Sequence, residues 1–205
     1  MKFNYGDFYK KYDMNGEIKI GTGIVKVHDI FNPLPEFMEQ ADVIFCDPPC
    51  SKINIKTFYT KADMLFNNDY LNFVKVLFEN IKIINPKILF LEVFKSNKNL
   101  FIDECKKLYK NIEVKDSCYY HNTKNKCWIL ICSNDEIPNL PNNIDEQDYI
   151  EWICKNINYN CIGDLCMGRG LVGFYSNKYG KKFVGTELNK KRLAVLLERI
   201  KNNKI

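Results

Sequence analysis

Two stretches of the sequence decide how this chain folds: Asp47-Pro48-Pro49-Cys50, and Asp164-Leu165-Cys166-Met167-Gly168-Arg169-Gly170. An apolar run leads into each of them, at 42–46 and at 161–165. Apolar runs that stop abruptly at such turns are typical of buried parallel strands. We therefore expect both stretches to be loops at the carboxyl ends of strands, which is the edge of an open α/β sheet where ligands bind.

Segments with strand and helix patterns alternate along the chain, which predicts an α/β fold with an open, mostly parallel sheet and helices on both faces. Two strand-like runs around the polar turn 122–126 predict an antiparallel hairpin. The strands are expected at 23–27, 42–46, 87–93, 117–121, 127–132, 161–165 and 182–187. The helices are expected at 70–84, at 100–109, at 146–157, between the glycine-rich loop and Tyr179, and at the end of the sequence. The apolar face of the helix at 70–84 is expected to hold Leu71, Val74, Leu77, Phe78 and Ile81. The apolar face of the last helix is expected to hold Leu193, Leu196, Leu197 and Ile200.

The length of 205 residues, of which 46% are apolar, suits a single core better than two. We expect one domain over 1–205, made of a first half at 1–132, a linker at 133–143 and a second half at 144–205. Positive charge gathers near the end, where nine Lys and Arg stand against two Glu between Tyr175 and Ile205. This region is either a phosphate-facing surface or the solvated face of a terminal helix.

The nine cysteines do not have the spacing of a zinc site, because no Cys-x-x-Cys pair occurs and the chain has two histidines. We expect no metal, and thiols that act as small buried hydrophobes. No apolar signal segment precedes Lys10, and no run reaches the roughly 18 apolar residues that span a membrane. The expected setting is therefore a reducing cytoplasm with no membrane partner.

Six of the ten glycines lie between Gly163 and Gly185, and none lies between Ile24 and Ile162. Such a cluster predicts a tight turn from strand to helix where a ligand approaches the backbone closely. Glu187 follows the next expected strand, where a carboxylate accepts hydrogen bonds from ribose hydroxyls. The pattern favours a nucleoside-bearing cofactor. Because Gly173 completes a Gly-x-Gly-x-x-Gly spacing, the glycines alone also allow NAD.

The chemistry of Asp47-Pro48-Pro49 suits an exocyclic amine of adenine or cytosine. The lone pair of such an amine is delocalised into the ring, so methylation is helped by acceptors that hold its N–H groups and support the charge developing on nitrogen. A carboxylate next to a carbonyl fixed by two prolines supplies those acceptors rigidly. This second motif turns the interpretation away from NAD and toward methyl transfer.

Three segments together resemble the amino-methylating DNA methyltransferases, which act on adenine N6 or cytosine N4. Asp47-Pro48-Pro49-Cys50 resembles their Asp/Asn/Ser-Pro-Pro-aromatic motif, 164–170 their Asp-Pro-Phe-x-Gly-x-Gly loop, and 183–193 the segment around their ribose-binding acid. The order, with the catalytic loop first, is that of the permuted beta-type branch. The resemblance runs from about Val27 to Ile200 and implies a Rossmann-like class I methyltransferase sheet with a circularly permuted motif order.

The resemblance also implies roles. The first half of the chain would be catalytic and the second half would bind S-adenosylmethionine. The substrate would be double-stranded DNA with the target base flipped out, and adenine N6 is favoured because Asp at this motif position is the commoner adenine form in the family. The catalytic residues would be Asp47, Pro48, Pro49 and Cys50, and the cofactor-binding residues Asp29, Asp164, Cys166, Gly168, Gly170, Glu187 and Asn189.

Three features depart from the family pattern. Cys50 replaces the aromatic residue that packs on the target base, so stacking would come from another ring. Leu165 and Cys166 replace Pro-Phe in the glycine loop, which removes a ring that contacts the methionine part of the cofactor. The chain has no insertion large enough for a target-recognition domain. Recognition of the DNA target sequence would therefore come from 51–67, the N-terminal segment, the hairpin, a homodimer or a separate specificity subunit. The candidate stacking rings are Phe58, Tyr59, Tyr119 and Tyr120.

Several alternatives stay open. Pro49-Cys50 also resembles the Pro-Cys nucleophile of cytosine-5 methyltransferases, with Glu92 in a later strand as the assisting glutamate, although other elements of that family are missing. The acceptor could be RNA or a free nucleotide, because the catalytic motif selects the amine and not the polymer. A non-catalytic relative that binds cofactor or nucleic acid is a further possibility. The richness in Asn, Lys and Ile indicates an AT-rich bacterial or phage genome.

Overall fold

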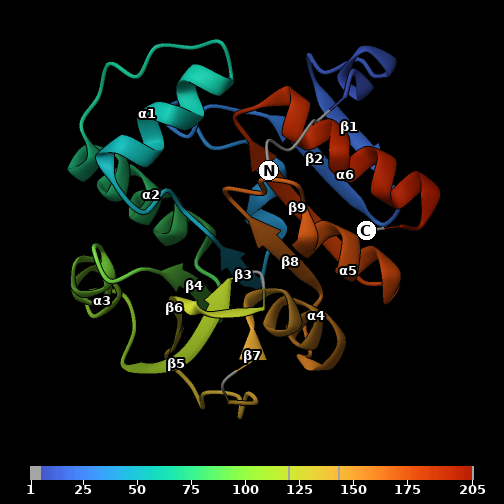
Figure 1. Ribbon diagram of the computed structural model, residues 1–205. Helices are drawn as coiled ribbons and strands as arrows, with labels where there is room; N and C mark the ends of the chain where they lie inside the picture. Colours follow the sequence, from blue (N-terminus) through green and yellow to red (C-terminus); the bar gives the residue numbers. More distant parts are fainter. Residues whose placement is uncertain (1–5, 120, 143, 205) are drawn as a thin grey trace.

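The computed structural model describes residues 6–119, 121–142 and 144–204. These residues form one nine-stranded sheet in the order β1-β2-β9-β8-β3-β4-β6-β5-β7 (Figure 1). The strands are β1 Glu17–Ile20, β2 Gly23–Val27, β3 Val43–Cys46, β4 Ile88–Val93, β5 Asn111–Tyr119, β6 Asn122–Ser133, β7 Ile144–Asp145, β8 Cys161–Asp164 and β9 Lys182–Glu187. The helices are α1 Lys52–Lys61, α2 Tyr70–Ile84, α3 Lys98–Cys105, α4 Glu146–Asn156, α5 Leu171–Lys178 and α6 Lys190–Asn202, with short 3-10 helices η1 Phe8–Lys11 and η2 Glu36–Gln40.

The middle of the sheet is parallel, as predicted: β2, β9, β8, β3 and β4 pair side by side in the same direction. The predicted antiparallel hairpin is β5 with β6, and it joins the sheet through β4. Strands β8 and β9 lie between β2 and β3. The segments before and after the irregular stretch 134–142 therefore interleave in a single sheet, although the division into halves and a linker stays a prediction.

Helices cover both faces of the sheet, which confirms that expectation (Figure 1). Side chains alternate between the two faces along a strand. In β3 this alternation directs Ile44 into a core formed with α1, α2 and α3, and directs Val43 and Phe45 into a second core formed with α4, α5 and α6. The fully apolar sequence of β3 is thus explained by burial on both sides.

Helix α2 has the predicted bounds, and Asp69 caps it by accepting a hydrogen bond of 2.7 Å from the Asn72 backbone N–H. One residue of its predicted apolar face is wrong: Leu71 is 66% exposed, whereas Phe73 is buried. Spacing defines the face of a helix but not how far the core extends along it. Helix α3 also differs, since it covers Lys98–Cys105 and not 100–109.

The hairpin is longer than predicted. Residues 122–126, expected as a polar turn, are the first residues of β6, and β5 begins at Asn111. The polar composition is misleading here because the outer part of a hairpin is held by backbone hydrogen bonds while its side chains face water. The structure also contains β1, β7 and α1, for which the sequence pattern gave no prediction.

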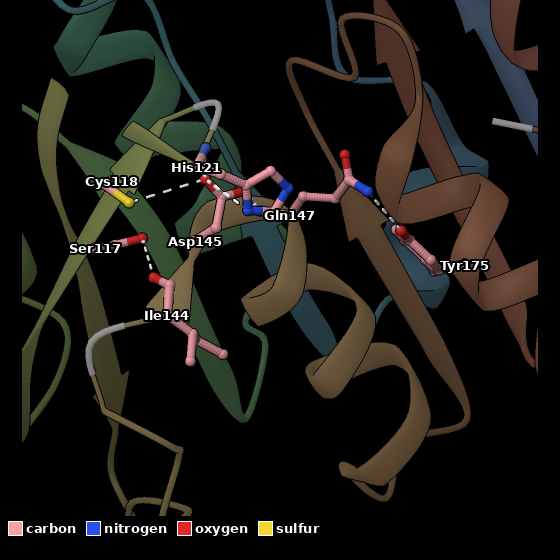
Figure 2. Close-up of polar contacts among 7 residues, drawn as sticks. All are labelled: Ser117, Cys118, His121, Ile144, Asp145, Gln147 and Tyr175. Carbon is pink, nitrogen blue, oxygen red and sulfur yellow. Dashed lines mark hydrogen bonds and ion pairs between the residues drawn. The ribbon is translucent and has the colours of Figure 1, made fainter. Parts of the chain in front are cut away.

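The turn end of the hairpin is fastened to the start of α4 (Figure 2). Ser117 Oγ donates to the Ile144 carbonyl at 3.0 Å, and the His121 backbone N–H donates to Asp145 Oδ2 at 2.5 Å. Asp145 also caps α4 by accepting from the Gln147 N–H at 3.0 Å. These bonds fix the last residue of β5, Tyr119, near the carboxyl edge of the parallel strands.

The nine cysteines are all free thiols, and most of them are buried, as expected for small hydrophobic side chains. Among the described residues, no cluster of three or more His, Cys, Asp or Glu side chains is arranged to hold a metal ion. None of the helices in the described part of the chain combines the length and the hydrophobicity needed to cross a bilayer.

Candidate active site

Carboxyl groups stand at the ends of four neighbouring parallel strands. Glu187 ends β9, Asp164 ends β8, Asp47 directly follows β3, and Glu92 lies near the end of β4. All four line one cavity of about 710 Å³. A cavity of about 300–1,000 Å³ at this edge of an α/β sheet is the usual place and size for a small-molecule site.

The cavity brings the two sequence motifs together and includes most of the predicted site residues. The residues that line it are Asp47, Pro48, Pro49, Cys50, Asp164, Cys166, Gly168 and Glu187, whereas Asp29, Gly170 and Asn189 lie outside its lining. Their assigned roles toward cofactor and substrate stay predictions, but the spatial convergence of the two motif loops is a property of the fold.

Asp47 is held by a tyrosine from the hairpin. The Tyr119 hydroxyl donates to Asp47 Oδ2 at 2.6 Å, and its ring stacks on Phe94 with centroids 5.3 Å apart and an interplanar angle of 18°. Asp47 is open to solvent at the cavity, but the protein atoms around it partly desolvate the carboxyl group and raise its pKa to about 6, while the Tyr119 hydrogen bond and the charge of Arg192 act in the opposite direction. The carboxylate is therefore mostly ionised above pH 6 and is ready to accept a hydrogen bond.

The backbone after Asp47 is fixed by hydrogen bonds with helices α1 and α2 and with the loop that follows β4. The Tyr70 hydroxyl donates to the Pro49 carbonyl at 2.8 Å, and Ser96 Oγ donates to the Cys50 carbonyl at 3.2 Å. The Cys50 N–H donates to Asn54 Oδ1 at 3.2 Å. The two prolines are buried. Such a loop presents its acceptors without needing to reorganise when a substrate arrives.

Glu187 joins the glycine loop to the start of α6. Its Oε2 accepts from the Gly168 N–H at 2.6 Å, and its Oε1 accepts from the Asn189 N–H at 2.9 Å. Burial raises the pKa of Glu187, with Arg192 acting against that shift. Since an ionised carboxylate has about four acceptor positions, these two bonds leave it able to accept further hydrogen bonds from a ligand.

The three predicted residues outside the lining make structural contacts. Asp29 Oδ1 accepts from the Tyr59 hydroxyl at 2.6 Å. Asn189 caps α6 by accepting from the Lys191 N–H at 2.9 Å. Gly170 has a φ of +73°, and a Cβ at this position would lie 2.6 Å from Leu196 Cβ. Gly170 is therefore required by backbone conformation and by close packing between the loop and α6.

Several cavity residues have no clear signal in the sequence. The motifs do not assign Phe94, and they give Glu92 only an assisting role in a different reaction. Of the predicted stacking rings, Phe58 lies under the Arg192 guanidinium at 4.6 Å, Tyr59 is buried against Asp29, and Tyr120 lies outside the described residues. The position of Phe94 directly after a buried strand is the signal that could have found it. Further lining residues that sequence reasoning did not assign are Glu146, Lys124, Lys126, Arg169 and Arg192.

The chain matches no protein-family model and no curated protein. Its fold is nevertheless that of DNA methyltransferases. The PvuII DNA methyltransferase, which is cytosine-N4-specific, aligns with 11% identity over 90% of this chain and 93% of its own, with a TM-score of 0.57. M1.HpyAVI aligns with 14% identity over 86% of this chain and 98% of its own, with a TM-score of 0.61. TTHA0409 from Thermus thermophilus, in complex with S-adenosyl-L-methionine, aligns with 12% identity over 80% and 88%, with a TM-score of 0.57.

Replacing Gly170 by Ala tests the packing of the glycine loop, and Gly180 is its matched control. Gly180 has a similar φ of +67°, but no heavy atom lies within 4 Å of the position of its Cβ. We expect Gly180→Ala to cost about 1–2 kcal/mol from backbone strain. Gly170→Ala should cost a further 1–3 kcal/mol or so from overpacking against Leu196. Urea unfolding measures both, and equal losses would contradict the packing argument.

Proposed function

We propose that this chain is an S-adenosylmethionine-dependent DNA methyltransferase that acts on an exocyclic amine. The observation that carries the proposal is the meeting of Asp47 and Glu187 in one cavity, at the ends of strands separated by β8. Three similar structures support it: M1.HpyAVI and TTHA0409 have each been solved with the methyl donor, and the PvuII enzyme is a DNA methyltransferase.

The residues at the glycine loop fit the cofactor. Glu187 keeps acceptor capacity for ribose hydroxyls, and Gly168, with a φ of +55°, leaves its backbone open to close approach. Asp164 and Cys166 line the same part of the cavity and would adjoin the methionine portion. When bound, S-adenosylmethionine supplies an electrophilic methyl group to the amine held at Asp47.

Asp47 would hold the amine and support the charge that develops on it. Tyr119 donates to Oδ2, so Oδ1 is directed to accept from the substrate N–H. The ionised carboxylate stabilises the positive charge on nitrogen in the transition state and receives the proton that the amine loses. The Pro48 carbonyl, fixed in the same loop, would accept from the second N–H.

The target base would reach this cavity by flipping out of duplex DNA. The family motif has an aromatic residue at the position of Cys50, and Phe94 is the proposed stacking ring in its place. Phe94 lines the cavity and already stacks with Tyr119. Lys124 and Lys126 of β6 also line the cavity and would contact phosphates. We favour adenine N6 as the methylated atom, because the resemblance of the motif with Asp at position 47 implies it.

A second candidate is cytosine-5 methylation, which one observation favours: Cys50 and Glu92, the two residues that this reaction would use, both line the cavity. The experiment that separates the candidates is transfer of radiolabelled methyl from S-adenosylmethionine to unmethylated DNA, followed by nucleoside digestion and mass identification. We expect N6-methyladenine. A product of 5-methylcytosine would make Cys50 the nucleophile and overturn the proposal.

Asp47→Asn should lower the rate of methyl transfer by roughly a hundred- to a thousandfold, because it removes the charged acceptor at the amine. The dissociation constant for S-adenosylmethionine should stay nearly unchanged. Asp103→Asn is the control, since Asp103 is exposed on α3 and should leave both quantities as in the parent protein. Loss of cofactor binding in Asp47→Asn would show that the roles of the two loops are assigned wrongly.

Glu187→Gln should weaken cofactor binding by about ten- to a hundredfold, since a charge-assisted hydrogen bond to the ribose is lost. The amide keeps one oxygen acceptor for the backbone N–H groups of Gly168 or Asn189. The dissociation constant is measured by calorimetry, and the melting temperature is measured on the same samples to detect a loosened loop. An unchanged dissociation constant would remove Glu187 from the ribose site.

The pH dependence of kcat/KM should report the ionisation of Asp47. Since the pKa of Asp47 is raised to about 6, activity should rise with pH through that value as the active carboxylate forms. Tyr119→Phe removes a hydrogen bond that lowers this pKa, so the acidic limb of the profile should move to higher pH. A limb that stays in place in Tyr119→Phe would exclude Asp47 as its source.

A further inference from the structure

Glu92 is a buried carboxyl group at the cavity wall that the proposed mechanism does not use. It is 1% exposed, and its Oε1 is a buried atom with no hydrogen-bond partner among the described residues. Burying a polar atom without a partner is costly, so native proteins retain one chiefly where it has a purpose. Because Glu92 also lines the cavity, the natural partner of this oxygen is a ligand.

The register of the sheet places Glu92 beside Asp47. Cys46 in β3 lies opposite Leu91 in β4, so Asp47 and Glu92 are the next positions along two adjacent parallel strands. Adjacent strands lie about 4.8 Å apart. The two carboxyl groups can therefore contact neighbouring atoms on one edge of a single flat ring. Phe94, the proposed stacking ring, is two residues farther along the same strand direction as Glu92 and lines the same cavity.

The surroundings of Glu92 favour its neutral form. Burial, and the nearby carboxylates of Asp47 and Glu146, raise the pKa of Glu92 well above its ordinary value, while the Cys127 thiol and the Tyr119 hydroxyl act against this shift. A neutral carboxylic acid differs from a carboxylate because it has an O–H to donate. Apolar enclosure is a known way for a protein to keep an acid neutral so that it can donate a hydrogen bond.

We propose that Glu92 is a specificity residue that donates a hydrogen bond to the unprotonated ring nitrogen beside the target amine, while Asp47 accepts one from the amine itself. Adenine presents this pair as N1 and the N6 amine, and cytosine presents it as N3 and the N4 amine. Thymine has neither group in these positions, because a carbonyl and a ring N–H replace them. The acid pair thus identifies an amino base within the cavity. This inference rests on the proposed amine methylation.

Base analogues test the hydrogen bond directly. Methyl transfer is measured on DNA that carries adenine or 1-deazaadenine at the target, or 3-deazacytosine if cytosine is the substrate; in each analogue a C–H replaces the ring nitrogen and the amine stays. We expect kcat/KM of the parent protein to fall by roughly ten- to a hundredfold on the analogue. In Glu92→Met, which has no donor, the two substrates should react at nearly equal rates, as a double-mutant cycle requires.

Two further variants separate recognition from a structural role. Glu92→Gln keeps an N–H donor, so it should restore most of the discrimination against the analogue. Because an amide does not ionise, the activity of this variant should not fall at a pH high enough to ionise Glu92 in the parent protein. Glu79→Met, on the exposed side of α2, is the control and should behave as the parent protein. Glu92→Met should melt at the same temperature or higher, because a buried acid with one unpartnered oxygen is replaced by an apolar side chain of similar size.

The outcomes distinguish the two proposals. If the parent protein methylates DNA and the penalty on the analogue is the same in Glu92→Met, this inference is wrong and the proposed function stands. If the parent protein transfers no methyl group to DNA, the proposed function fails. If the product is 5-methylcytosine, both fail, because Glu92 then assists attack on the ring.

Discussion

Parallel pairing of the central strands is the constraint on which this structure depends. It brings Glu187, Asp164, Asp47 and Glu92 to one edge of the sheet, in the order of β9, β8, β3 and β4. Like charges that are gathered and partly buried oppose folding unless donors hold them or protons neutralise them. The loops above the sheet supply both solutions. Backbone N–H groups hold Glu187, a tyrosine holds Asp47, and burial raises the pKa of Glu92 well above its ordinary value.

This arrangement divides one cavity into two electrostatic regions. On the β9 side, the backbone N–H groups of Gly168 and Asn189 donate to the carboxyl group of Glu187. On the β4 side, the acids differ in protonation, with Asp47 at a pKa of about 6 and Glu146 at a pKa raised to about 8 by burial and by Asp145 and Asp47. Carboxyl groups whose environments separate their pKa values can take different tasks within one site. The cavity therefore contains acids that differ in how readily they lose a proton.

The framework could be predicted from sequence because its signals are local. The bounds of β2, α2 and β9 match the predicted ranges, since each segment has a clear apolar pattern and a clear end, such as Asp69 before α2. The motif loops were placed correctly at strand ends for the same reason. The full length of β5 and β6 was not predictable, because their outer residues are paired by the backbone and carry polar side chains that look like a turn.

The rest of the site depends on contacts that have no sequence pattern. Glu146 reaches the cavity because Asp145 fastens the hairpin to the start of α4, and Tyr119 reaches Asp47 by the same contact. Phe94 is among the rings that line the cavity, and it directly follows a strand expected to contribute only to the core. The reverse also occurs: the motifs assigned three residues to the cofactor that do not line the cavity. In the structure their contacts are with other residues of the protein; they are Asp29, Gly170 and Asn189.

The position of β8 and β9 has a consequence for how the chain is made. Both strands come from the last part of the sequence, yet they fill the gap between β2 and β3, which are synthesised first. Until residues 161–187 have left the ribosome, β3 has an unpaired and wholly apolar edge. Such an edge readily pairs with other chains, and parallel partners that are distant in sequence join slowly. A chain interrupted before residue 161 would therefore be prone to aggregation, because it would lack the strands that close its own core.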